Sequence, residues 1–213
     1  MRAIVLDGYG EPDVLHPADV ESPDPGPGQV RVVVGGSSVN PVDLSTRAGL
    51  ASGAIPDPVF PMVLGWDASG RVDAVGEGVT KFSVGDRVIG VSVWFVTRRG
   101  TYADQVVLDE DACALAPAGI DDVHACTLPL NGLTAWSAVA VAAVEPGDTL
   151  LVTGAAGAVG GFAVQLSLPF DRLSGTALDA ALDDVREKFG SKALTRAVLL
   201  GRDEGFSVPM LPD

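Results

Sequence analysis

Residues 148–166 read DTLLVTGAAGAVGGFAVQL, and this stretch governs how the rest of the chain is interpreted. A short apolar run, Leu150 to Thr153, leads into glycines at positions 154, 157 and 160, and an apolar helical pattern follows. A strand, a glycine-rich turn and a helix in this order bring backbone N–H groups and the positive end of a helix close to a pyrophosphate. The pattern indicates a dinucleotide-binding turn, although the same spacing also occurs in tight turns that bind no ligand.

Charge and apolar patterning restrict the class of protein. The 213 residues carry 14 basic and 28 acidic side chains, a formal net charge of −14, which disfavours binding to nucleic acid or to an anionic membrane. The N-terminus lacks the features of a signal peptide. Gly, Pro and charged residues interrupt every apolar run before the roughly 18 residues that a membrane span needs. We therefore expect a cytoplasmic protein with no membrane segment.

Metal-binding and redox motifs are sparse. The chain has two cysteines, Cys113 and Cys126, and two histidines, His16 and His124. No Cys-x-x-Cys spacing occurs, which argues against a structural zinc site. Both cysteines are expected to be buried apolar residues, with a reactive thiol as the alternative.

The first 120 residues have the pattern of short β-strands separated by turns. Strands are expected at 2–7, from Val30 onward, in three pieces within 61–90, and at 102–108 and 112–115. A short helix is expected at 44–48, entered through the turn Asn40-Pro41. Turns recur about every 8 to 12 residues, which favours a small barrel or sandwich.

The pattern changes near Asp121 to long apolar helical sequence, which marks a domain boundary between 120 and 130. The turn Glu145-Pro146-Gly147-Asp148 then enters the glycine-rich stretch. A β domain followed by the start of an α/β domain is predicted, with parts at 1–125, 126–166 and 167–213.

Five segments occur in an order that resembles the medium-chain dehydrogenase/reductase superfamily, and most of all its zinc-independent quinone oxidoreductase branch. The resemblance covers residues 1–166. It implies a barrel-like GroES-like β domain at 1–125 and the first part of a Rossmann dinucleotide-binding domain, here truncated, at 126–166. The segments are VNPVDLSTRAG (39–49), PMVLGWDASGRVDAVGEGVTKFSVGDRVIG (61–90), GTYADQVVLDEDACALAP (100–117), LPLNGLTAW (128–136) and VEPGDTLLVTGAAGAVGGFAVQL (144–166).

The resemblance also implies chemistry without zinc. In the zinc-using alcohol dehydrogenases of the superfamily, a Cys lies near the position of Asn40 and a Gly-His-Glu stands in place of Gly65-Trp66-Asp67. Asp67 alone cannot hold a zinc ion that needs three or four ligands. The implied reaction is hydride transfer from NAD(P)H, with NADPH favoured over NADH and no metal, to a small-molecule quinone or enone. A homodimer is compatible with this family.

The resemblance assigns roles to particular residues. Asn40 and Thr134 are the expected catalytic residues, lying beside the nicotinamide, while Asp43 holds the local turn. The pyrophosphate would be bound by Gly154, Gly157, Ala158, Val159 and Gly160.

Structural alternatives remain for several of these residues. Asn40-Pro41 can be only a turn, Thr134 a helix residue whose hydroxyl bonds back to a carbonyl, and Asp67 a cap. Trp66 and Trp94 either line a substrate pocket or belong to the core.

The final part departs from this family. Asp179, Asp183 and Asp184 lie where an acidic ribose ligand is expected, but they fall on the polar side of an amphipathic helical pattern at 174–190. A strand is expected at 195–200. Residues 165–213 resemble the C-terminus of the little-finger domain of Y-family DNA polymerases, so the chain resembles an in-frame fusion.

This fusion leaves a second interpretation of the whole chain. The alternative to an oxidoreductase is a truncated, fused product without catalysis, with DNA association through the tail as a minor possibility. Residues 167–213 carry six basic and eight acidic side chains, which argues against binding to phosphates.

Overall fold

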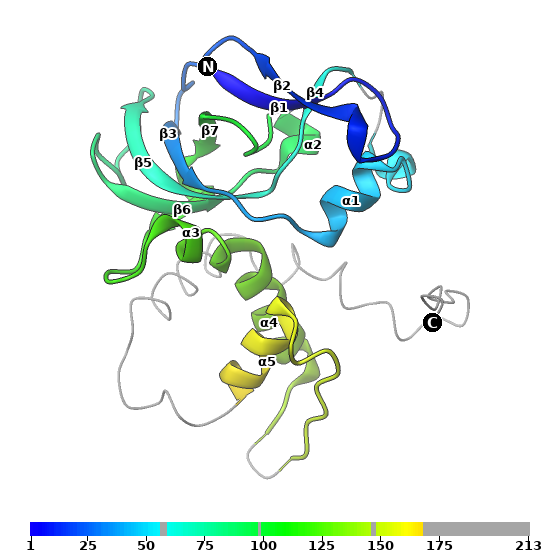
Figure 1. Ribbon diagram of the computed structural model, residues 1–213. Coiled ribbons are helices and arrows are strands. Elements are labelled where there is room, and N and C mark those ends of the chain that lie inside the picture. The colour runs from blue at the N-terminus through cyan, green and yellow to red at the C-terminus, as the bar shows by residue number, and fades with distance from the viewer. Residues whose placement is uncertain (56–58, 98, 146–147, 168–213) are drawn as a thin grey trace. The chain divides into compact units, whose positions relative to one another are not determined.

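The computed structural model describes residues 1–55, 59–97, 99–145 and 148–167 (Figure 1). The chain divides into two compact units, the first covering Met1–Leu130 and the second beginning at Asn131. The amphipathic helix expected at 174–190, the strand expected at 195–200 and the polymerase-like tail lie outside the described residues.

The first unit is built from two antiparallel sheets, and Figure 1 shows β3, β5 and β6 as neighbouring, curved strands. The three-stranded sheet has the order β2-β1-β4 and the five-stranded sheet the order β7-β3-β5-β6-β8. This architecture confirms the barrel-like β fold expected from the sequence. The strands are β1 (Arg2–Leu6), β2 (Leu15–Asp19), β3 (Gln29–Gly36), β4 (Met62–Val63), β5 (Asp67–Val75), β6 (Arg87–Val91), β7 (Gln105–Asp109) and β8 (Cys113–Leu115).

Alternating apolar residues place the main core between these strands. Val30 and Val32 in β3 are both fully buried, one on either side of the half-buried Arg31, as the period of two in a strand requires. They pack with Val72, Val88 and other apolar residues of β5, β6 and β7. Cys113 belongs to the same cluster, and Cys126 is also buried. The expectation of buried cysteines is therefore confirmed.

Strand β2 was not expected from the sequence. It contains Pro17 and several exposed positions, so it lacks the alternating apolar pattern of the other strands. Among the strands that the structure describes it pairs only with β1, with Pro17 opposite Ile4. An edge strand tolerates proline because one side of its backbone has no ladder partner.

The helices follow the local signals in the sequence, with one exception. The expected helix after Asn40-Pro41 begins earlier than predicted, at Pro41, because proline is well suited to the first helical position. The four-residue helix α2 was not expected. The helices are α1 (Pro41–Arg47), α2 (Trp94–Thr97), α3 (Asp122–Ala125), α4 (Leu128–Ala142) and α5 (Ala158–Ser167), with 3-10 turns at Pro12–Val14, Ser52–Ala54 and Glu110–Ala112.

One expectation for the second unit is wrong. Leu150 to Thr153 do not form a strand, and Leu151 is 84% exposed. A strand needs a neighbouring strand for its backbone hydrogen bonds. Among the described residues from 131 onward the regular elements are helical, so this segment has no ladder to join. The expected helix after the glycine turn is present as α5.

The run Asp122–Ala142 is long and apolar enough to cross a membrane, with a mean hydropathy of 1.3, contrary to the sequence-based expectation. Helix α4 continues through Pro129 and Gly132 without a break. Pro129 occupies the first turn, where proline is tolerated. Core helices of water-soluble proteins pass the same test, and Asp122 at the start of this run forms an ion pair in the first unit.

Candidate functional site

A buried carboxylate lies at the centre of the candidate site. Asp67, the first residue of β5, is 0% exposed. Its Oδ2 accepts hydrogen bonds from the Ser38 hydroxyl at 2.5 Å and from the Asn40 side-chain amide at 2.9 Å. Its Oδ1 accepts the backbone N–H of Leu130 at 2.7 Å. Asp67 therefore ties together the segment after β3, the start of α1 and the first turn of α4.

Asn40 is held on several sides within the first unit. It is the N-cap of α1, in a capping box with Asp43, whose carboxylate accepts the Asn40 backbone N–H at 2.8 Å. Its side-chain amide also donates to Ser38 Oγ at 3.1 Å, and the residue is 3% exposed. The expected turn at Asn40 and the role of Asp43 in it are thus observed. The contact of Asn40 with a nicotinamide stays a prediction.

Burial controls the ionisation of this cluster. It raises the pKa of Asp67, and the hydrogen bonds from Ser38, Asn40 and Leu130 oppose that rise. It also raises the pKa of Asp43, against the backbone N–H of Asn40 and the Tyr102 hydroxyl. Burial, together with the nearby Asp43, raises the pKa of Tyr102 above its usual range, so the phenol stays neutral at physiological pH.

The turn before Asp67 requires a glycine. Gly65 has a φ of +101°, and a Cβ there would lie 2.4 Å from Thr101 Oγ1 and 2.6 Å from the Tyr102 ring. The Thr101 hydroxyl is paired with that of Ser37 at 2.7 Å. The backbone therefore passes close to Thr101 and Tyr102, which fixes where Asp67 enters β5.

The residue between Gly65 and Asp67 lies in an aromatic cluster. Trp66 meets Trp94 edge to face, with ring centroids 6.2 Å apart, and lies 5.4 Å from the ring of Phe95. Trp94 is 1% exposed, so its core role is confirmed. Trp66 is half-buried and remains the better candidate for lining a substrate pocket.

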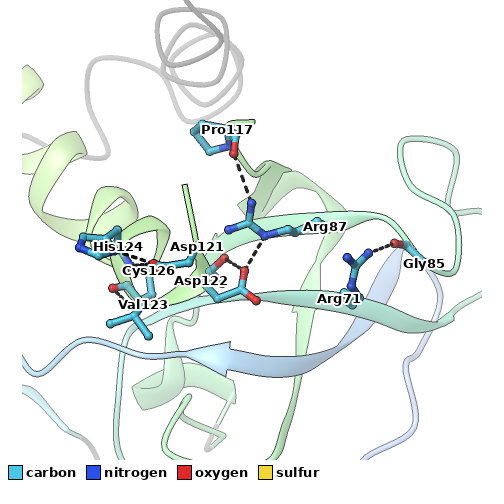
Figure 2. Close-up of polar contacts among 10 residues, drawn as sticks. Arg71, Gly85, Arg87, Pro117, Asp121, Asp122, Val123, His124 and Cys126 are labelled. Carbon is cyan, nitrogen blue, oxygen red and sulfur yellow. Dashed lines mark hydrogen bonds and ion pairs between the residues drawn. The ribbon is translucent and has the colours of Figure 1, made fainter. Parts of the chain in front are cut away.

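Helix α3, which precedes α4, is attached to the sheet by a second carboxylate (Figure 2). Asp122 Oδ1 accepts from the Ser69 hydroxyl and from Arg87 Nε, both at 2.7 Å. A Cβ at Gly36 in β3 would lie 2.5 Å from the Asp122 carbonyl oxygen, so only glycine allows α3 to approach this closely. Figure 2 shows Arg87 lying between Asp122 and the carbonyl of Pro117. Sequence reasoning did not identify this cluster, because its members are far apart in the chain.

The remaining expected site residues belong to the second unit. Thr134 lies in α4, and the glycine turn leads directly into α5. Gly154 has a φ of +65°, and a Cβ at Gly160 would lie 2.3 Å from the Gly154 carbonyl oxygen. Ala158 and Val159 are the first residues of α5, where backbone N–H groups lack intrahelical acceptors. These features fit the cradle that a pyrophosphate requires.

The donor set does not fit zinc. Both oxygens of Asp67 are engaged by protein donors, and its neighbours offer an amide and an indole where zinc would need imidazole or thiolate. Within the described ranges, no three His, Cys, Asp or Glu side chains come together as a potential metal site. Burial also raises the pKa of the Cys126 thiol and raises the pKa of the Cys113 thiol to about 12. Both thiols therefore stay protonated at neutral pH, whereas metals bind the thiolate.

The fold and site define a known class of domain. Residues 26–118 match the family model of the alcohol dehydrogenase GroES-like domain. The first unit therefore has a GroES-like fold, and the chain is similar to quinone oxidoreductases.

Individual relatives agree with this assignment. A quinone oxidoreductase of Pseudomonas aeruginosa is 37% identical over 165 residues, which cover 77% of this chain and 48% of the relative. The structure of the quinone oxidoreductase from Coxiella burnetii matches with a TM-score of 0.72 and 33% identity, over 78% of this chain and 52% of that one. The structure of a mycobacterial protein complexed with NADPH matches with a TM-score of 0.68 and 33% identity, over 78% and 49%. The chain thus spans about half the length of the relatives that it matches.

Proposed function

We propose that the protein is an NADPH-dependent oxidoreductase that transfers a hydride to a quinone or enone without zinc. The observation that carries this proposal is the close contact between Gly154 and Gly160 at the start of α5. This contact leaves no room for a side chain at Gly160, in the turn that is proposed to bind the pyrophosphate. The similarity to quinone oxidoreductases and to a protein complexed with NADPH supports the choice of cofactor and substrate.

A bound reduced nicotinamide would supply the hydride, and the residues of the chain would bind and orient the reactants. The N–H groups of Ala158 and Val159 are the proposed donors to the pyrophosphate. Asn40 and Thr134 are the proposed contacts of the nicotinamide. Tyr102, which keeps its proton, is a neutral hydrogen-bond donor within the cluster around Asn40.

The hydrogen bonding of Asp67 supports the proposed zinc independence. Both carboxylate oxygens already accept protein donors, so a metal would have to displace at least one of them. Hydrogen bonds to the substrate carbonyl can polarise it in place of a Lewis acid. Incubation with a chelator should therefore leave the activity unchanged.

The experiment is the oxidation of NADPH by the full chain in the presence of a benzoquinone, followed by absorbance. Saturable turnover that survives chelation and is not increased by added zinc supports the proposal. No turnover, together with no saturable NADPH binding at millimolar concentration, would refute it. NADH is tested in parallel, because the expected preference is for NADPH.

A second candidate is a non-catalytic product, favoured by one observation. Leu151 is exposed, and Leu150 to Thr153 are not in a sheet within the part of the chain that the structure describes. Limited proteolysis that leaves only about the first 130 residues would support this candidate, because a partly formed α/β layer exposes cleavable backbone. The polymerase-like tail stays a prediction, and a test for binding to short single-stranded DNA at physiological salt addresses it.

A further inference from the structure

Asn40, a proposed nicotinamide contact, and the first turn of α4 are connected to a single acidic side chain. One oxygen of the Asp67 carboxylate accepts the side-chain amide of Asn40, and the other accepts the Leu130 N–H in the first turn of α4. We propose that Asp67 is the positioning residue for Asn40, because it fixes Asn40 and the first turn of α4 relative to each other. This inference rests on the proposed function.

The contact with α4 has the form of a helix cap supplied from a strand. The first four N–H groups of a helix have no intrahelical acceptor, and that of Leu130 is one of them. A carboxylate at this end of a helix is further stabilised by the helix dipole. The bond at 2.7 Å is in the range of charge-assisted hydrogen bonds. Asp67 therefore determines where the first turn of α4 lies.

The position of Asn40 depends on this connection, because Asp67 holds its side-chain amide. Because a misplacement of about 1 Å can cost about 100-fold in rate, a small displacement of Asn40 has a measurable effect.

Asp67 is itself well placed to act as a fixed reference. It is opposite Val91 in the ladder between β5 and β6, and the close passage of Gly65 past Thr101 fixes the backbone before it. A buried carboxylate is costly unless several donors surround it. Here the donors come from two segments far apart in sequence, residues 38–40 and the first turn of α4, which is the arrangement expected of a residue that holds those segments in register.

The variant Asp67→Asn tests the proposal with little change in volume. Whichever way its amide is turned, an NH2 group faces either the amide of Asn40 or the N–H of Leu130, so one of the two connections is lost. We expect kcat with NADPH and a benzoquinone to fall about 10- to 100-fold, while KM for NADPH changes by less than about threefold. In the cofactor-free chain, amide hydrogen exchange at 128–134 should be faster than in the wild type.

Two further variants separate the connection from general stability. Leu130→Pro removes the backbone donor together with the leucine side chain, at a position where the first turn of a helix tolerates proline. Leu130→Ala is the control for the lost side chain. Leu130→Pro should reproduce the loss in kcat beyond that of Leu130→Ala. Asp122 holds α3 but contacts neither Asn40 nor Leu130. Asp122→Asn should therefore leave kcat within about threefold of the wild-type value.

The outcomes distinguish this inference from the proposed function. An active wild type with an Asp67→Asn variant of normal kcat would overturn the positioning role and leave the function standing, and so would an equal loss of kcat in Asp122→Asn. If the wild type oxidises no NADPH, the proposed function fails. Hydrogen exchange then still decides whether Asp67 holds α4: faster exchange in Asp67→Asn supports the connection, and unchanged exchange overturns it.

Discussion

Replacing Asp122 by alanine should destabilise the first unit, and the size of the effect can be worked out from the contacts. The change removes the acceptor of the Ser69 hydroxyl and of Arg87 Nε, both 2.7 Å away. Ser69 is 0% exposed, and an unsatisfied buried hydroxyl costs about 1–3 kcal/mol. The Arg87 side chain is 23% exposed, so the lost ion pair adds about 1 kcal/mol. The expected loss is about 3 kcal/mol in the free energy of unfolding.

The loss should depend on pH with a definite sign. Burial opposes ionisation of Asp122, but the hydrogen bonds from Ser69 and Arg87 outweigh it and lower its pKa. A group with a lowered folded-state pKa stabilises the fold above its unfolded pKa, about 4, and this contribution is lost as pH falls through the folded value. The difference between wild type and variant should therefore shrink below about pH 4.

The assay is urea unfolding followed by tryptophan fluorescence, since Trp66 and Trp94 both lie in the first unit. Asp19→Ala, an exposed aspartate in β2, is the matched control and should stay within about 0.5 kcal/mol of the wild type. A loss below about 1 kcal/mol at neutral pH would contradict this prediction, because the buried Ser69 hydroxyl and the half-buried Arg87 guanidinium would then have lost their acceptor at little cost. A loss of the same size at acidic and neutral pH would refute the electrostatic part.

Two further predictions concern the second unit and the buried carboxylates. Gly160→Ala places a methyl group 2.3 Å from the Gly154 carbonyl oxygen and should weaken NADPH binding at least about tenfold in a calorimetric titration. Gly132→Ala is the control, because a Cβ at Gly132 has nothing within 4 Å, and it should leave the affinity unchanged. Equal affinities of the two variants would contradict the proposed pyrophosphate cradle. Burial raises the pKa of Asp67, so its contribution to stability is fully present below about pH 4 and is lost as pH rises through the folded value. In unfolding curves the stability of the wild type relative to Asp67→Asn should fall over that range, and a rise would contradict the sign.

The sequence predicted those parts of the fold that depend on short-range patterns. The alternation in β3, the Asn40-Pro41 start of α1 and the glycine turn before α5 are all written in neighbouring residues, and the structure contains them. The strand expected at 150–153 was wrong because a strand depends on partners elsewhere in the chain as well as on its own residues. Strand β2 was missed for the converse reason, since its pairing with β1 forms without an apolar pattern.

The candidate site was only partly predictable. Asn40 and Gly65-Trp66-Asp67 were recognised through family resemblance, but Asp67 was expected to be mainly structural, with a cap as its alternative role. Its importance comes from hydrogen bonds to residues 27 and 63 positions away in sequence, which no local pattern encodes. The cluster around Asp122 was missed for the same reason, because the Ser69 hydroxyl that donates to Asp122 is 53 positions away in sequence.

The proposed hydride transfer from NADPH to a carbonyl-activated substrate can be followed directly. The most direct measurement uses NADPH carrying deuterium at the transferred position of the nicotinamide and a conjugated enone, with mass spectrometry of the product. We expect one deuterium on the β-carbon of the reduced enone and a proton from solvent on the α-carbon. The same product is expected in the presence of a chelator. A reduced product without deuterium, or no product at saturating NADPH, would contradict the proposed hydride transfer.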